Sequence, residues 1–194
     1  PQHWPKDLDY TNKKVVVIGS GATAMTLVPA MADDAASVTM LQRSPTYVVA
    51  RPDQDKIANT LRKLLPDSVA YALTRFKNTQ LQHFMYQRMR KEPTKMKKAL
   101  VGMVSDALGP DYDVKKHFTP KYNPWDQRLC LIPNGDLFKS IKKGKTQVIT
   151  DQIDTFTANG ITLTSGDTLE ADIIITATGL NMQVMGGSTF AVDG

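Results

Sequence analysis

The stretch KVVVIGSGATA, residues 14–24, decides the fold of this 194-residue chain. Its first part, Lys14–Gly19, is a continuous apolar run rich in β-branched residues, which is typical of a strand buried on both faces of a parallel sheet. Its second part reads G-x-G-x-x-A. The first glycine of such a motif allows a tight turn, the second lets the backbone approach a pyrophosphate, and the small third residue lets a helix pack on the strand. The motif predicts that a dinucleotide site is built from Gly19, Ser20, Gly21, Ala22, Thr23 and Ala24.

The residues after the motif supply the context that it requires. Small and apolar side chains predict a helix over residues 22–32, and SVTML, residues 37–41, predicts a second strand. Together these elements form one unit of about 30 residues, the size of a dinucleotide-binding βαβ unit. A pyrophosphate would lie on the exposed N–H groups at the N-terminus of the helix. The alternative is a tight strand–helix turn that binds nothing.

The residues that end the second strand indicate which dinucleotide is bound. NAD-binding units usually carry Asp or Glu there, which bonds the ribose 2′-hydroxyl. This chain has Gln42, Arg43 and Ser44 instead. A guanidinium and a hydroxyl favour a 2′-phosphate through charge-assisted hydrogen bonds, whereas a carboxylate would repel it. The sequence therefore predicts NADP(H), with Gln42, Arg43 and Ser44 at the cofactor; the alternative is that Arg43 is an ordinary surface arginine.

The rest of the chain completes an α/β fold. Helical spacing of apolar residues, interrupted at Pro66 and Pro93, predicts helices within residues 54–108. The remaining expected elements are a long loop over 109–133, a short helix over 136–142, a strand over 147–150, a hairpin of 154–157 with 161–164, and a strand over 172–176. We therefore expect a Rossmann-type parallel sheet with a β-hairpin or meander crossover and a helical insertion. The nucleotide-binding domain would comprise residues 1–53 and 109–194, and the insertion residues 54–108.

The last expected strand runs into Ala177, Thr178 and Gly179. Small residues at the carboxyl end of a parallel strand allow backbone and ligand to approach closely at the binding edge of the sheet. Thr178 and Gly179 are therefore further candidates for cofactor binding.

Composition narrows the functional class. Residues 54–108 contain eleven Lys and Arg against four Asp and Glu, while the other residues contain thirteen against fifteen. A basic helical segment can meet nucleic acid or anionic lipid, but it more often is a solvated face or packs on an acidic neighbour. We expect no nucleic-acid partner. No apolar run approaches the roughly 18 residues that span a bilayer, so we expect no transmembrane segment and a cytoplasmic location.

Other reactive side chains show no pattern of a site. Cys130 is the only cysteine, which excludes an internal disulfide and a CxxC motif, and its apolar neighbours predict a small buried residue. His83 and His117 are isolated and lack metal-ligand spacing, so we expect no metal site. The aromatic residues of the long loop, Phe118, Tyr122 and Trp125, either wall a substrate or nicotinamide pocket or pack the loop.

Several stretches together resemble the class B flavoprotein monooxygenases, the Baeyer–Villiger and flavin-containing monooxygenases. The resemblance covers nearly the whole chain and is strongest to the bacterial group of ethionamide-activating enzymes. It rests on VVVIGSGATA (15–24), LQRSPTYVVARP (41–52), FTPKYNPWDQRLC (118–130) and ATGLN (177–181). Of the family fingerprint F-x-G-x-x-x-H-x-x-x-W-P only Trp4 and Pro5 are present, and His3 is not the histidine of that fingerprint.

The resemblance implies that this chain is one part of a larger enzyme. In the family this domain binds NADPH and is inserted into an FAD domain that has its own glycine motif. The chain contains a single G-x-G-x-x-A, so we expect it to bind NADPH, not to hold FAD, and to be inactive without the missing FAD domain. The complete enzyme would reduce FAD with NADPH and use O2 to oxygenate a small ketone or a sulfur or nitrogen centre. The Trp4-Pro5 remnant and Arg128 favour the Baeyer–Villiger branch.

The resemblance also implies one catalytic residue. An arginine in the loop before the short helix stabilises negative charge during oxygenation, and in this sequence it is Arg128. Many relatives have Lys-Arg here, whereas this chain has Gln127 before Arg128 and thus one cation fewer. Alternatively Arg128 pairs with Asp126 or Asp136. Two other functions stay open: an NADPH-dependent flavoprotein reductase that binds two dinucleotides, and a noncatalytic NADPH-binding module that contacts a partner through its basic helices.

Overall fold

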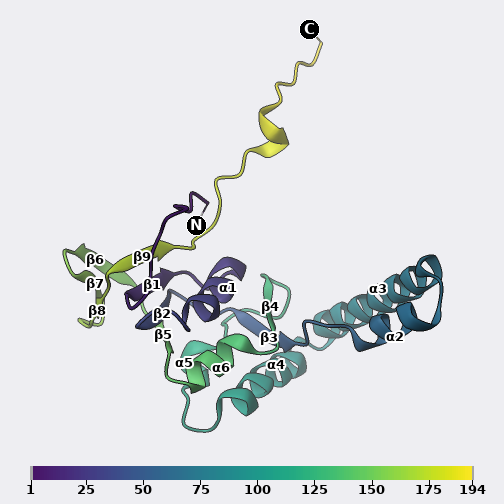
Figure 1. Ribbon diagram of the computed structural model, residues 1–194, viewed down its shortest axis with the longest axis horizontal. Helices are drawn as coiled ribbons and strands as arrows, with labels where there is room; N and C mark the ends of the chain where they lie inside the picture. Colours follow the sequence, from purple (N-terminus) through teal and green to yellow (C-terminus); the bar gives the residue numbers. More distant parts are fainter. Residues whose placement is uncertain (1, 194) are drawn as a thin grey trace.

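A four-stranded parallel sheet forms the centre of the computed structural model, which describes residues 2–193 (Figure 1). Its strand order is β5-β2-β1-β9. The strands are β1 (Lys14–Ile18), β2 (Ser37–Gln42), β5 (Thr146–Thr150) and β9 (Ile173–Thr176). Val16 of β1 pairs in register with Thr39 of β2 and with Ile174 of β9. The α/β class with a parallel sheet is confirmed.

The two faces of the sheet are covered by different kinds of structure. Helices α1 (Ala22–Met31) and α6 (Asp136–Lys142) pack on one face, where Val15 and Val17 belong to the main core. Val16 points to the other face and packs with Ile161 and Leu163. Those two residues come from an antiparallel meander of β6 (Ile153–Thr157), β7 (Gly160–Leu163) and β8 (Thr168–Glu170). The apolar run of β1 is therefore buried on both sides, and the expected β-meander crossover is present.

A second, two-stranded parallel sheet lies where no strand was expected. It pairs β3 (Tyr47–Arg51) with β4 (Leu129–Pro133). The prediction of a loop over 109–133 is wrong at its end, and also at α5 (Val114–His117), whose first turn is capped by Asp113. Each strand has only five residues, and its partner lies about eighty positions away in the chain, so local periodicity gives no sign of the pairing.

The helical segment divides into a projecting part and a packed part. Helices α2 (Lys56–Leu64) and α3 (Asp67–Lys91) form an arm that extends away from the sheet (Figure 1). Helix α4 (Pro93–Leu108) packs against β3 and α6, and its Val104 and Leu108 lie in the main core. The expectation that these helices stand apart from the sheet thus holds for α2 and α3 but not for α4.

Both termini leave the molecule at the same side (Figure 1). The C-terminal segment beyond β9 runs outward and includes the short 3-10 helix η1 (Val184–Gly187). Among the helices of residues 2–193, none has both the length and the apolar character that crossing a membrane requires.

Candidate functional site

A cleft of about 990 Å³ opens at the carboxyl ends of β1, β2, β5 and β9. In open α/β sheets this edge is where ligands bind. Most of the residues predicted from the sequence line it: Gly19, Ser20, Gly21, Ala22, Thr23, Arg43, Ser44, Arg128, Thr178 and Gly179. Ala24 lies beneath the cleft in the main core with no exposed surface, which agrees with its predicted packing role.

The first two glycines are required for different reasons. Gly19 has a positive φ of 127°, and a Cβ atom there would lie 2.5 Å from the carbonyl oxygen of Ala177. It is therefore needed by the fold itself. Gly21 has an ordinary φ of −81°, and a Cβ atom there would meet nothing within 4 Å. The protein alone gives no reason for glycine at this position, whereas a ligand that approaches the backbone does.

Gly21 also marks an uncapped helix end. It is the N-cap residue of α1, makes no side-chain capping hydrogen bond, and is followed by no acidic residue in the first turn. The first N–H groups of a helix lack partners within the helix, and the helix dipole places partial positive charge there. The N-terminus of α1 therefore offers hydrogen-bond donors to an anion in the cleft.

Two arginines bring full positive charge to the same cleft. Arg43 and Ser44 are exposed just after β2, and Arg128 is exposed just before β4. Within residues 2–193 neither arginine forms a salt bridge. The alternative pairing of Arg128 with Asp126 or Asp136 is not observed: Asp126 pairs with Arg90 of α3 at 2.8 Å, and Asp136 accepts the backbone N–H of Leu137.

Gln42 lies outside the cleft, which corrects its assignment as a cofactor residue. Side chains alternate along a strand, so Gln42 points to the face opposite to the cleft-lining Leu41. It is 1% exposed, and its Nε2 donates to the carbonyl of His117 at 2.7 Å and to the Thr150 hydroxyl at 2.8 Å. The Gln42 side chain thus links the end of β2 to α5 and β5 through hydrogen bonds.

His117 belongs to the same buried cluster. Its Nδ1 lies 2.9 Å from the Thr150 hydroxyl, and burial lowers the pKa of the imidazole. The residues described contain no group of three or more His, Cys, Asp or Glu that could hold a metal ion. His117 therefore takes part in the hydrogen bonds that join α5 to β2 and β5.

Sequence reasoning missed Asp151, a carboxylate that lines the cleft directly after β5. Hydrogen bonds with Ser165 and Thr164 and with the backbone N–H of Gln152 lower the pKa of Asp151 to about 2. The Thr164 hydroxyl donates at 2.8 Å and the Gln152 N–H at 2.7 Å. Asp151 is therefore ionised and tied to its own side of the cleft. Asp151 could have been found from its position at the carboxyl end of β5, because β5 pairs in parallel with β2, whose carboxyl end carries Arg43.

The aromatic residues of the 118–128 segment pack the segment and do not line the cleft. Phe118 is 2% exposed within the main core. The Tyr122 ring packs edge-on against Tyr47 with centroids 5.4 Å apart. The Trp125 Nε1 donates to the sulfur of Met89 at 2.9 Å. Of the two alternatives left by the sequence, loop packing is the one observed.

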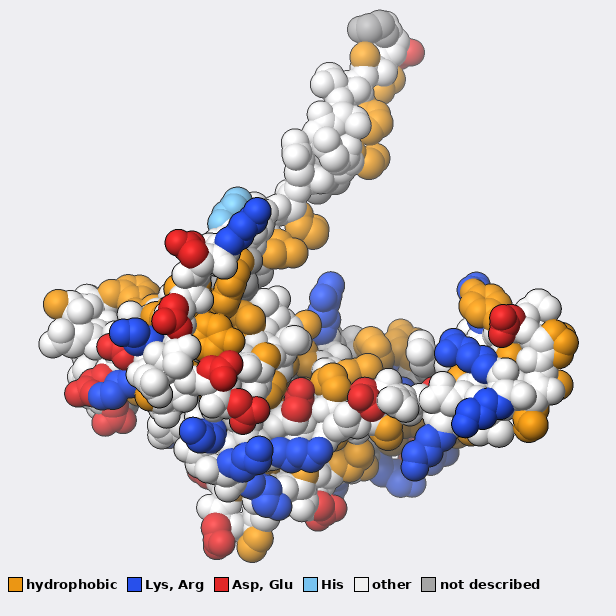
Figure 2. Space-filling view, viewed as in Figure 1, with side chains coloured by type: hydrophobic (Ala, Val, Ile, Leu, Met, Phe, Trp, Pro, Cys, Tyr) orange, Lys and Arg blue, Asp and Glu red, His pale blue; other side chains and the backbone are white. Residues whose placement is uncertain are grey.

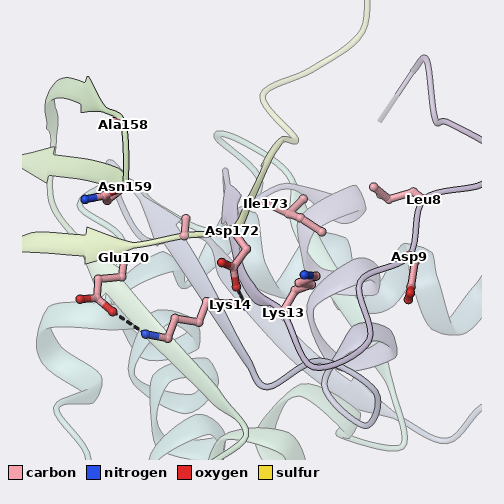
Figure 3. Close-up of a pocket in the computed structure, with 10 residues that line it drawn as sticks. Leu8, Asp9, Lys13, Lys14, Ala158, Asn159, Glu170, Asp172 and Ile173 are labelled. Atoms are coloured by element: carbon pink, nitrogen blue, oxygen red, sulfur yellow. Dashed lines mark hydrogen bonds and ion pairs between the residues drawn. The ribbon is translucent and has the colours of Figure 1, made fainter.

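A second hollow, of about 730 Å³, lies at the amino ends of β1 and β9 (Figure 3). Two of its carboxylates and one of its lysines are already bound within the protein. Lys14 forms a salt bridge with Glu170, and Asp172 accepts the backbone N–H of Lys14 at 2.7 Å. This hollow lies at the end of the strands opposite to the glycine motif, and none of the predicted cofactor residues lines it.

Comparisons with known proteins agree with this geometry, although no family model matches the chain. It is 58% identical over 195 residues to the FAD-containing monooxygenase EthA of Mycobacterium tuberculosis, covering 100% of this chain and 40% of that protein. It is 54% identical over 198 residues to the putative FAD-containing monooxygenase MymA of the same organism, again over 40% of its length. The chain thus spans about 40% of the length of these relatives.

Solved structures show the same fold at low sequence identity. An oxidized steroid monooxygenase bound to NADP superposes with a TM-score of 0.66 at 16% identity, covering 92% of this chain and 41% of that one. A complex of OTEMO with FAD and NADP gives a TM-score of 0.67 at 16% identity, covering 91% and 39%. By sequence the chain therefore corresponds to one part of the flavoprotein monooxygenases of the EthA and MymA group, and the solved structures share its fold.

Proposed function

We propose that this chain is the NADPH-binding part of an FAD- and NADPH-dependent monooxygenase, which uses O2 to oxygenate a small ketone or a soft sulfur or nitrogen centre. The observation that carries the proposal is the convergence of Gly21, the uncapped N-terminus of α1 and Arg43 on one cleft. The relatives named FAD-containing monooxygenases and the neighbours with NADP support it. Because NADPH is an intracellular cofactor, we also propose a cytoplasmic location.

The cleft suits the two phosphate-bearing parts of NADPH. The pyrophosphate would accept hydrogen bonds from the N–H groups of Gly21 and Ala22 at the start of α1, where a side chain on Gly21 would intrude. The 2′-phosphate would lie at Arg43 and Ser44, which offer a cation and a hydroxyl. Among the described residues Asp151 forms no salt bridge with Arg43, and its Oδ1 accepts hydrogen bonds from the Thr164 hydroxyl and the Gln152 N–H.

Arg128 is the proposed catalytic residue. Its side chain lines the cleft, and its charge is permanent because a guanidinium does not lose its proton in proteins. A fixed cation stabilises negative charge that develops during oxygenation without needing to transfer a proton. The sequence has one glycine motif, which NADPH would occupy. FAD, which supplies the oxygen-activating chemistry when bound, would be held by the rest of the enzyme.

The glycine motif offers a direct test in the complete enzyme. Gly21→Ala places a methyl group in space that is open in the protein but that the pyrophosphate would fill. We expect NADPH to bind at least about tenfold more weakly, a loss of about 1.4 kcal/mol, while the unfolding temperature stays unchanged. Gly102→Ala in α4 is the matched control, because a Cβ atom there also meets nothing within 4 Å. Titration of NADPH with an unchanged dissociation constant for Gly21→Ala would refute the proposed site.

A further inference from the structure

Three separate segments of the cleft meet at one side chain that does not line it. The Thr46 hydroxyl lies 2.9 Å from the hydroxyl of Ser20, in the glycine loop. The same Ser20 hydroxyl donates to the carbonyl of Ser44 at 3.3 Å. Thr46 is half-buried and lies two residues beyond Ser44, outside the lining of the cleft. The loop for the pyrophosphate and the turn for the 2′-phosphate are thus joined by hydroxyl groups.

These hydrogen bonds give the Ser20 side chain a structural role. A serine hydroxyl has a single proton, and that of Ser20 is directed to Ser44 or Thr46. Its hydroxyl is therefore occupied within the protein, so Ser20 acts as a brace in addition to lining the cleft. The sulfur of Cys130 in β4 also lies 3.9 Å from the carbonyl oxygen of Ser20.

The third segment is the one that leads to Arg128. Burial raises the pKa of the Tyr122 phenol, and a side-chain hydrogen bond with Thr46 partly opposes this. The Tyr47 hydroxyl donates to the Tyr122 carbonyl at 2.6 Å. Tyr122 is therefore held by Tyr47, the first residue of β3, through this hydrogen bond and an edge-on ring contact, and Arg128 follows six positions later in the chain.

We propose that Thr46 is the positioning residue that sets the preference for NADPH, because its hydroxyl fixes the Arg43–Ser44 turn against the glycine loop. The inference rests on the proposed function and deepens it. Thr46 touches no cofactor. It acts through Ser20 and Ser44, by holding the turn at the distance from the pyrophosphate where the 2′-phosphate meets Arg43. A turn without this brace would still bind the part of the cofactor that NADPH and NADH share.

The test compares two variants of the complete enzyme. Thr46→Val keeps the shape of the side chain but removes the hydroxyl, and Thr46→Ser keeps the hydroxyl. Titrations with NADPH and NADH give both dissociation constants, and thermal unfolding is measured in parallel. We expect Thr46→Val to weaken NADPH binding about two- to tenfold, the effect of one ordinary hydrogen bond, and to change NADH binding less than about twofold. Thr46→Ser should retain the preference of the unmodified enzyme.

A double-mutant cycle separates positioning from general loosening. In an Arg43→Ala background the group that the turn presents is gone, so Thr46→Val should have no further effect on the ratio of the two constants. If Thr46→Val left the ratio of the NADPH and NADH dissociation constants unchanged, the inference would be overturned while the proposed function stayed intact. An unmodified enzyme that binds NADPH and NADH equally would overturn both.

Discussion

The cleft and the helical arm are both basic, but they present their charge in different ways. In the cleft, Arg43 and Arg128 face the same concave space as the N-terminus of α1. On the arm, residues 56–91 hold eight Lys and Arg against one Asp, and these side chains are spread over helices that project from the core (Figure 2). An excess of positive charge along the chain therefore does not indicate where the proposed site lies. Convergence of donors from separate segments does.

The two regions also differ in what holds them. The cleft residues are fixed by strand pairing and by the Ser20–Thr46 contact. Helix α3 buries only Ala70 and Met89, although it is 25 residues long. Large apolar side chains of the arm remain exposed: Ile57, Leu64, Tyr71, Phe76 and Phe84. Single substitutions in the cleft are therefore expected to change cofactor binding and turnover. Single substitutions in the arm are expected to change how readily its helices open locally.

The largest effect is expected from Arg128→Ala in the complete enzyme. Loss of a preorganised group that faces developing negative charge typically costs on the order of a hundred- to a thousandfold in rate. Oxygenation should fall by that factor, while reduction of the flavin by NADPH should persist, since Gly21 and Arg43, the residues proposed to bind NADPH, are unchanged. Stopped-flow measurement of flavin reduction and then of product formation checks both steps.

Lys121→Ala is the control for Arg128→Ala, because Lys121 is a cation of the same segment that does not line the cleft. Normal product formation by Arg128→Ala would make Arg128 a structural residue.

Next in size is the effect of Arg43→Ala on cofactor preference, which compares the two regions directly. Hydrogen bonds to charged groups contribute roughly 1.5–3 kcal/mol, so the preference for NADPH over NADH should fall by about one to two decades. Arg62→Ala removes an equally exposed arginine from the arm and should leave both dissociation constants unchanged. If the two substitutions had equal effects in parallel titrations, the contrast between cleft and arm would not hold.

The smallest effect concerns the contact between α2 and α3, the two helices of the arm. Asp55 caps α2 by accepting the N–H of Ala58 at 3.0 Å, and it forms a salt bridge with Lys77 of α3. The side-chain hydrogen bond with Lys77, followed by the bond from Ala58, lowers the pKa of Asp55 from 3.8 to about 2. A carboxylate with a lowered pKa stabilises the folded state above its unfolded-state pKa, and this stabilisation is lost as pH falls from about 4 toward 2.

Asp55→Asn isolates that charge, because asparagine also caps helices well. Amide hydrogen exchange in α2 should be faster in Asp55→Asn than in the unmodified protein at pH 6. The difference should shrink as the pH approaches 3. A difference that stays constant over this range would show that the Asp55 charge does not hold the arm.

The features that the sequence predicted correctly are encoded by neighbouring residues. The apolar run of β1, the glycines at 19 and 21 and the breaks at Pro66 and Pro93 each act within a few positions. The error at Gln42 has the same local origin: the sequence placed it at the strand end, but the face to which its side chain points depends on register. Conversely, β3 and β4, Asp151 and the Thr46 contact depend on pairing between distant segments, and no local pattern records that pairing.

The floor of the cleft behaves as one rigid piece. The Gly19 N–H donates to the Leu41 carbonyl at 2.8 Å, the Ala177 N–H donates to the Ile18 carbonyl at 2.8 Å, and the Ala177 carbonyl lies against Gly19 itself. These contacts fasten the ends of β1, β2 and β9 together, so the strands cannot part to let a nucleotide in or out. If NADPH binds here as proposed, it would enter and leave through motion of the loops that form the walls. Loop motions occur in nanoseconds to microseconds and collective domain motions in microseconds to milliseconds, and these times would set the upper limit on the rate of cofactor exchange.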